Sequence, residues 1–195
     1  MKIIGAFKKI FRIILMLFFR FDQWHTSPIE NRQYACDVIK ELRKEANRNT
    51  AMELGCGLGD IIGNLDYKEK YFLDISENAL NAAKFLQLFS FKDTYNIYKV
   101  FDFLVDLLEE DISLDAIILV NWIHGYDSQI LRLRICKLIE NNLNAHGILV
   151  FDIIDNNSNY KYNHKVQDLI DESRFDIKII DGYKFGRKLV YAKLK

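Results

Sequence analysis

A glycine-rich loop follows a short apolar segment and reads ELGCGLGD over positions 53–60. Glycine adopts backbone conformations that are closed to other residues, so Gly55, Gly57 and Gly59 allow a tight turn that brings backbone N–H groups close to a ligand. The dinucleotide-binding pattern GxGxxG needs glycine or alanine at position 60, where this chain has Asp60. The loop therefore indicates a ligand site of another kind, with the acid Glu53 in front of it.

Two further acids follow strand-like segments, and in a parallel sheet the carboxyl ends of the strands carry the ligand site. Asp74 is suited to accept hydrogen bonds from two ribose hydroxyls. Asp102 is suited to bind an adenine amino group, with Phe101 or Phe103 stacking on the ring. Asp106 lies four residues further on and is an alternative to Asp102 in that role.

The elements that must position these residues alternate between strand and helix. Strand-like segments cover residues 50–54, 70–73, 96–101, 115–120, 147–154, 175–180 and 188–194. Helical patterns cover 29–46, 76–89, 128–144 and 165–173, a further helix begins within 60–65, and residues 155–165 form a surface loop. This alternation predicts an α/β fold, a parallel sheet with helices on both faces. The last two strands predict a hairpin that adds one antiparallel strand, and Gly147 is expected to end the helix before it.

Composition excludes several classes of protein. The 195 residues fit one domain, and 27 basic against 27 acidic residues give no basic excess for nucleic acid. Cys36, Cys56 and Cys136 are far apart and odd in number, so neither a disulfide scaffold nor a zinc site is expected. The chain is predicted to hold no metal and to be reduced and cytoplasmic.

The charge is concentrated at the N-terminus. The first 21 residues carry five cations and no acid, which leaves −5 on the remaining 174. The longest uncharged apolar run, residues 13–19, is too short to span a bilayer, and no small-residue cleavage site follows it. The pattern predicts a helix in a membrane interface, which would place the protein on the inner face of the membrane. Packing on its own domain or on a second subunit is the alternative.

In this order, the segments resemble class I S-adenosylmethionine (SAM)-dependent methyltransferases over about residues 51–195. The run MELGCGLGD is similar to the family's loop under the methionine part of SAM, and Asp74 in FLDIS to its ribose-binding acid. Asp102 matches the adenine-contacting position, and residues 115–127 and 143–153 resemble the fourth strand with its loop and the joint to the fifth strand. The resemblance implies a doubly wound, mostly parallel seven-stranded sheet, SAM as cofactor and an activity in class EC 2.1.1.-.

The resemblance also assigns site residues. Cofactor contacts fall on Glu53, Gly55, Cys56, Gly57, Gly59, Asp74, Ile75, Asp102, Phe103 and Asn121. Histidine is the natural base for an acceptor that must lose a proton. His124, after the fourth strand, is the first candidate, with cofactor contact or simple packing as the alternative, and His25 is the second.

Segments before the core of such enzymes often form a lid over the cofactor. This implies a lid or substrate role for Trp24, Arg32, Tyr34, Trp122 and Tyr126. The alternative is that Ser27 caps a helix and Trp24 staples it. Residues 1–28 are therefore predicted to form a basic apolar helix and lid, and residues 29–195 the methyltransferase domain.

The predicted reaction is O-methylation of a small or lipid- or polysaccharide-linked acceptor, by in-line transfer of the SAM methyl group. No NPPY or DPPY tetrapeptide and no Pro-Cys pair is present, which argues against the methyltransferases of nucleic acids. The main alternative is a non-catalytic SAM-binding partner subunit of a larger complex. A nicotinamide-dependent oxidoreductase is a third reading.

Overall fold

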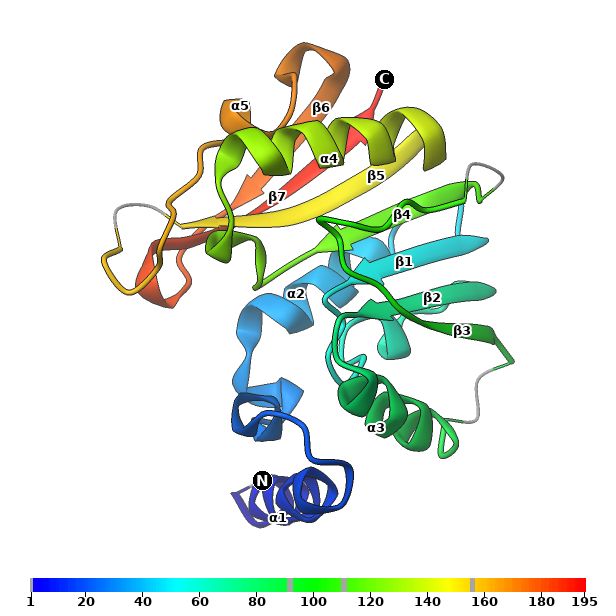
Figure 1. Cartoon of the computed structure of the whole chain (residues 1–195), viewed down its shortest axis with the longest axis vertical. Helices are drawn as coiled ribbons and strands as arrows, with labels where there is room; N and C mark the ends of the chain where they lie inside the picture. Colours follow the sequence, from blue (N-terminus) through cyan, green and yellow to red (C-terminus); the bar gives the residue numbers. More distant parts are fainter. Residues whose placement is uncertain (1, 91–92, 110–111, 155–156) are drawn as a thin grey trace.

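The computed structural model describes residues 2–90, 93–109, 112–154 and 157–195. In it a sheet lies between two layers of helices (Figure 1). The strands are β1 Thr50–Leu54, β2 Glu69–Asp74, β3 Tyr95–Val100, β4 Leu114–Leu119, β5 Leu143–Ile154, β6 Phe175–Ile180 and β7 Arg187–Leu194. The α-helices are α1 Lys2–Phe19, α2 Gln33–Leu42, α3 Glu77–Gln87, α4 Ser128–Asn142 and α5 Val166–Leu169.

The strands form one seven-stranded sheet in the order β3-β2-β1-β4-β5-β7-β6. Strands β1 to β5 run parallel, and β7 is antiparallel to both of its neighbours, β5 and β6. The predicted doubly wound, mostly parallel sheet with an antiparallel C-terminal hairpin is confirmed. Strand order reverses between β1 and β4, which is the place where open α/β sheets bind ligands.

Burial explains why the sheet is stable. All six residues of β4 are buried because the strand is covered on both faces. Helices α4 and α5 pack on one face of the sheet, and α2 and α3 on the other. Helix α1 packs outside this arrangement, on α3, at one end of the molecule (Figure 1).

Three predicted helices have different bounds in the structure. The helix predicted over 29–46 is a 3₁₀ turn, Ile29–Asn31, followed by α2, because Arg32 has non-helical dihedral angles. The helix expected within 60–65 is only the 3₁₀ turn Ile62–Asn64, since the chain reaches β2 within a few residues. The segment 165–173 holds the short α5 and a separate turn, Glu172–Arg174, which the Asp171 side chain caps.

Gly147 does not end a helix. Helix α4 stops at Asn142, whose amide donates to the carbonyls of Glu109 and Ile112, and β5 begins at once. Gly147 lies inside β5, directly after a β-bulge at which His146 has a φ of +64°. The prediction was wrong because the residue with the left-handed conformation is His146, whereas Gly147 does not have the positive φ of a C-cap glycine.

Candidate functional site

The glycine loop lies at the carboxyl end of β1 and has the backbone geometry that only glycine adopts freely. Gly57 and Gly59 have φ angles of +53° and +69°. A Cβ on Gly57 would overlap the ring of His25, and one on Gly59 the buried ring of Phe72. Glycine at these positions therefore lets side chains of other elements approach the loop backbone closely.

Asp74 at the end of β2 is tied to this loop. One carboxylate oxygen accepts from the Gly57 N–H at 2.7 Å, and the other accepts from the Ser76 N–H at 2.8 Å. Ser76 itself caps α3 by accepting from the Ala79 N–H, as its sequence position predicts. An ionised carboxylate has about four acceptor sites, so Asp74 retains acceptor capacity toward a ligand. Ile75, the next residue, is exposed.

Glu53, the last residue but one of β1, is a buried acid beside the loop. Its carboxylate accepts from the Ile62 N–H at 3.0 Å. Burial raises its pKa to about 8, and the Ile62 hydrogen bond only partly offsets that effect. Glu53 is therefore mostly protonated at neutral pH unless a cation enters beside it.

A lid covers the loop from the N-terminal side. It consists of the 3₁₀ turn η1, Gln23–Thr26, in which the Trp24 ring stacks on the His25 ring at 3.6 Å between centroids. The His25 ring rests on Gly57, and burial lowers its pKa, so the imidazole is neutral at pH 7. Ser27 makes no capping hydrogen bond in the structure, so the alternative of a Ser27 cap is wrong.

Asp60, at the end of the glycine loop, binds two arginines that the sequence did not connect. Arg12 of α1 donates to Asp60 at 2.9 Å and also forms an ion pair with it, and Arg32 forms a second ion pair. Burial alone would raise the pKa of Asp60, but both arginines outweigh it and hold the pKa below its usual value. Arg12 also donates to the carbonyls of His25 and Ser27, at 3.1 Å each. The lid, the loop and α1 are thus held together by one side chain.

The end of β4 carries a second buried polar cluster. Asn121 has a φ of +78°, and its N–H donates to Asp152 of β5 at 2.7 Å. Arg187 at the start of β7 pairs with Asp152 and donates to the Asn121 side chain at 2.8 Å. Burial would raise the pKa of Asp152, but the hydrogen bond from His124 and the charge of Arg187 hold it below its usual value.

His124 belongs to this cluster. It lies in the 3₁₀ turn η4, Ile123–Gly125, is buried, and its Nε2 is 3.0 Å from Asp152 Oδ2. Its Nδ1 has no hydrogen-bond partner among the described residues. Tyr160 and His164 pack against its ring, with centroids 5.2 and 6.0 Å away. The described part of the predicted surface loop, residues 157–165, is irregular and mostly exposed, and residues 155–156 lie outside the described residues. His164 is the exception in it, since its side chain is buried and within hydrogen-bond distance of the Ile123 carbonyl.

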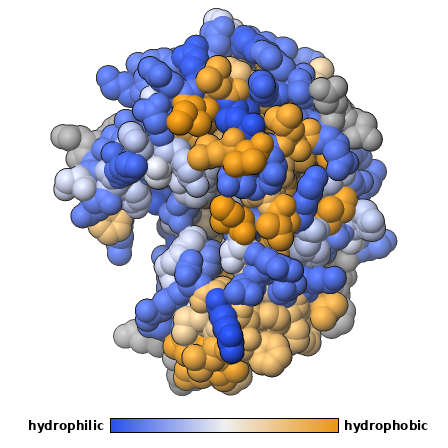
Figure 2. Space-filling model, viewed as in Figure 1, coloured by the Kyte–Doolittle hydropathy of each residue, from blue (hydrophilic) through white to orange (hydrophobic). Residues whose placement is uncertain are grey.

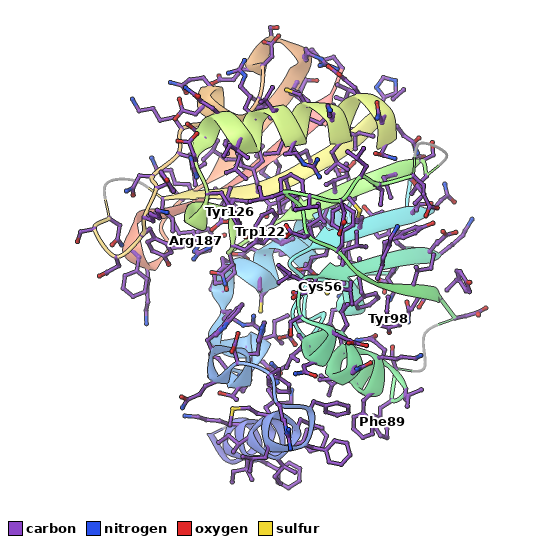
Figure 3. All side chains as sticks on the ribbon, viewed as in Figure 1. Cys56, Phe89, Tyr98, Trp122, Tyr126 and Arg187 are labelled. Carbon is purple, nitrogen blue, oxygen red and sulfur yellow. The ribbon has the colours of Figure 1, made fainter. Side chains whose placement is uncertain are left out.

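A small cavity of about 30 Å³ lies between the lid, the loop and the end of β4. Its wall consists of Trp24, His25, Arg32, Tyr34, Glu53, Gly55, Cys56, Leu58, Asp60, Ile61, Val120, Asn121 and Trp122. Figure 3 shows Cys56, Trp122 and Arg187 along this edge of the sheet, with Tyr126 just above Trp122 in this view. His25 is on the wall, whereas His124 is not.

Several predicted residues lie beside the cavity without lining it. Asp102 Oδ1 accepts from the Leu104 N–H at 2.9 Å, and its own N–H donates to Asp106 at 2.7 Å. Phe103 packs edge-on against Trp122 with ring centroids 5.2 Å apart. Tyr126 packs on the other side of Trp122 at 5.7 Å. Through its contact with Phe103, Trp122 packs the loop after β4 against the segment after β3.

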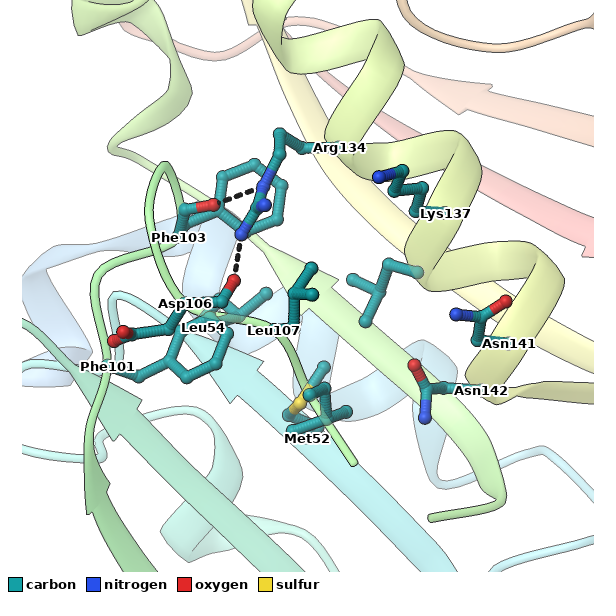
Figure 4. Close-up of a pocket in the computed structure, with 12 residues that line it drawn as sticks. Met52, Leu54, Phe101, Phe103, Asp106, Leu107, Arg134, Lys137, Asn141 and Asn142 are labelled. Atoms are coloured by element: carbon teal, nitrogen blue, oxygen red, sulfur yellow. Dashed lines mark hydrogen bonds between the residues drawn. The ribbon is translucent and has the colours of Figure 1, made fainter. Parts of the chain in front are cut away.

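A second cavity opens behind that segment, where residues 101–109 and 112–113 form no helix (Figure 4). Met52, Leu54, Phe101 and Phe103 give it an apolar lining. Arg134 of α4 closes one side by donating to the Phe103 carbonyl at 2.6 Å and to the Asp106 carbonyl. Phe103 therefore lines this second cavity and also contacts Trp122.

Sequence reasoning missed Arg12, Asp60, Asp152 and Arg187. Asp152 ends the apolar run ILVFD of β5, and an acid at a strand end was the available signal. Among the described residues, no three His, Cys, Asp or Glu side chains come together as a metal site would require.

The sheet order, the antiparallel β7 and the glycine loop after β1 define the Rossmann-like fold of class I SAM-dependent methyltransferases. No protein-family model and no curated protein matches the chain by sequence.

Solved structures do match the fold. Magnesium protoporphyrin IX methyltransferase from Synechocystis PCC 6803, with bound S-adenosylhomocysteine (SAH), aligns with a TM-score of 0.69 at 14% identity over 100% of this chain and 99% of that one. The N-methyltransferase NodS of Bradyrhizobium japonicum WM9, also with SAH, has a TM-score of 0.68 at 14% identity, over 84% of this chain and 86% of that one. At these identities the likeness establishes the fold.

Proposed function

We propose that the chain is a SAM-dependent methyltransferase of class EC 2.1.1.- that methylates an oxygen of a small or lipid- or glycan-linked acceptor. One observation carries the proposal. The positive-φ glycine loop stands at the reversal of strand order, bound to Asp74 and roofed by His25, with a small cavity beside it. The solved structures that match this fold include ones with bound SAM or SAH.

The residues around the cavity fit the functional groups of SAM. The acceptor capacity that Asp74 retains suits ribose hydroxyls. Arg32 has an Nε without a hydrogen-bond partner among the described atoms and suits a carboxylate, while Glu53 and Asp60 suit an ammonium group. When bound, SAM supplies a methyl group on a positively charged sulfur.

The chain's own contribution to the reaction is positioning, exclusion of water and removal of a proton. Trp24 and Trp122 close the cavity from opposite sides. His25 lies on the wall and is neutral, so its ring can accept a proton from an acceptor hydroxyl. His124 is held by Asp152 with a free Nδ1, which is also the state of a base, but it lies behind the wall.

Two matched variants separate the two histidines. His25→Asn and His124→Asn are tested for SAH affinity by calorimetry and for turnover with methyl-labelled SAM. We expect His25→Asn to lower kcat about 10²-fold or more and to remove the pH dependence of kcat, because a base is lost. His124→Asn is expected to lower kcat without removing that dependence, because it disturbs the Asp152 cluster. The opposite pattern would assign the base to His124.

The acceptor is tested in parallel arms. Soluble sugars and sugar lipids in vesicles are each incubated with labelled SAM and the chain. We expect the label to transfer to an oxygen, which the NMR chemical shift of the transferred methyl group identifies as an O-methyl ether. Transfer to nitrogen, or SAH binding without transfer to any acceptor, would contradict the O-methylation proposal.

The alternative of a non-catalytic partner subunit uses the N-terminal helix as a docking element, and a helix plugged into the cleft or into a dimer seam would favour it. The described side chains of α1 do not line the cavity, and α1 lies on α3 instead. We also propose that the protein works in the cytoplasm on the inner face of the membrane, because α1 carries an exposed apolar face and contains no acid.

A further inference from the structure

Helix α1 presents an apolar face that nothing in the described structure covers. Seven large apolar side chains point away from the domain, namely Phe7, Ile10, Phe11, Ile13, Ile14, Leu17 and Phe18. Phe7, Leu17 and Phe18 are each more than 70% exposed. With 3.6 residues per turn, the seven fall on one side of the helix, while Leu15 and Phe19 face α3 on the other. A soluble surface helix shows the reverse arrangement, with its apolar side inward.

The end of α3 extends this face. The rings of Phe19 and Phe85 are 5.7 Å apart, and those of Phe85 and Phe89 are 5.3 Å apart. Leu88 and Phe89, at the end of α3, are 73% and 62% exposed. Figure 2 shows apolar side chains gathered over α1 at the lower end of the molecule. The apolar surface is therefore a continuous patch on two helices, and such patches mark interaction sites.

Charge identifies the occupant as an anionic lipid surface. Helix α1 contains no acid, and Lys9 and Arg20 are exposed beside the apolar face. Lys84 of α3 is exposed one turn before Leu88. Lys8 and Arg12 pair with Glu30 and Asp60 of the chain itself. A second copy docked face to face would bring the exposed Lys9 and Arg20 against the same cations of its partner, whereas anionic headgroups attract them. No helix among the described residues is long and apolar enough to cross a bilayer.

We propose that the outward face of α1, continued by the end of α3, docks on an anionic membrane surface. The helix lies in the interface plane, with Phe and Ile side chains below the headgroups and Lys9 and Arg20 among them. The docking does not depend on the proposed methyl transfer.

The docking has a consequence that does rest on the proposed function. Arg12 leaves the other side of α1 and binds Asp60 of the glycine loop together with the carbonyls of His25 and Ser27. The membrane helix is thus joined rigidly to the lid and the loop, without a flexible tether. The cavity is held at a fixed height above the lipid surface, as a lipid-linked acceptor requires.

The experiment is co-sedimentation of the full chain with vesicles of phosphatidylglycerol and phosphatidylcholine, with pure phosphatidylcholine vesicles as the neutral arm. The double variant Leu17→Glu/Phe18→Glu changes exposed side chains only. Its matched control is Val105→Glu/Leu133→Glu, in which the two apolar residues are 73% and 68% exposed on another part of the surface. We expect the wild type and the control to bind anionic vesicles, more weakly as salt rises, and the α1 variant to bind at least tenfold more weakly.

Three outcomes overturn the proposal. In the first, the wild type does not sediment with anionic vesicles. In the second, the α1 variant binds these vesicles as tightly as the control variant does. In the third, the wild type is a dimer by light scattering, the α1 variant is a monomer, and neither binds lipid, which assigns the face to a second copy.

The connection from α1 to the cavity through Arg12 is tested separately by measuring SAH affinity. Arg12→Gln should keep vesicle binding and weaken SAH binding severalfold, with partial rescue by Arg12→Lys, and unchanged SAH affinity in Arg12→Gln would refute the link alone.

Discussion

Glu53 is expected to lose a proton when SAH binds. Its carboxyl group is buried on the cavity wall, and burial raises its pKa to about 8. SAH, like SAM, carries an ammonium group, and a cation placed against a carboxyl group favours the ionised form. The perturbation is therefore the arrival of one positive charge beside a protonated acid.

The magnitude follows from the pKa. With a pKa of about 8, Glu53 in the free protein holds about 0.9 proton at pH 7. If the bound form is ionised, SAH binding releases about 0.9 proton per molecule, and the affinity rises about fivefold between pH 7 and pH 8.

Calorimetry measures the release directly. The chain is titrated with SAH at pH 7 in several buffers, and the slope of the observed enthalpy against the buffer's ionisation enthalpy gives the number of protons. Glu53→Gln preserves the shape and an oxygen acceptor for the Ile62 N–H and should bring the slope to zero. Glu69→Gln, at the other end of the neighbouring strand, is the matched control and should behave as the wild type.

The pH dependence of the free energy of unfolding gives a second test, because the raised pKa of Glu53 fixes the direction of the change. The folded pKa of Glu53 lies above the ordinary value of 4.5, so the folded state binds the proton more tightly than the unfolded chain. Stability is therefore highest below pH 4.5 for this group and falls as pH rises through about 8, by at most about 5 kcal/mol. Glu53→Gln should remove that decline. A wild type that releases no proton, or a Glu53→Gln protein that releases as many, would refute the reasoning.

Three further stability differences are expected in urea unfolding. Gly125→Ala, where a Cβ meets nothing within 4 Å, should change stability little, and Gly182→Ala, with equal space but a φ of +89°, should cost about 1–2 kcal/mol. Gly59→Ala combines a positive φ with a buried ring in its way and should cost about 3 kcal/mol or more, so equal losses at Gly59 and Gly182 would contradict the packing of the loop. Arg187→Met should cost about 3–5 kcal/mol because it leaves the Asp152 carboxylate buried without its cation, and a loss below about 1 kcal/mol would contradict that pairing.

The sequence was sufficient for those parts of the site that are local. A positive-φ loop needs glycines at fixed spacing, and Asp74 follows its strand directly, so both are visible along the chain. The hairpin was also predictable, because two adjacent apolar segments with a short connection leave few other arrangements.

The missed parts depend on tertiary contacts. Asp152 and Arg187 meet only because β7 runs antiparallel beside β5, and Arg12 meets Asp60 only because α1 folds back on α3. No local pattern distinguishes these arginines from surface cations. The same contacts explain why His124, predicted beside the reacting groups, lies in a buried cluster behind the cavity wall.

The central claim is that the glycine loop and Asp74 bind the adenosyl cofactor of a methyltransferase. The most direct measurement is calorimetric titration of the full chain and of Asp74→Ala with SAM, SAH and NADH, with circular dichroism to show that both proteins are folded. We expect the wild type to bind SAM and SAH but not NADH, and we expect folded Asp74→Ala to bind none of them. Binding of NADH alone, or SAH binding of equal affinity in folded Asp74→Ala, would contradict it.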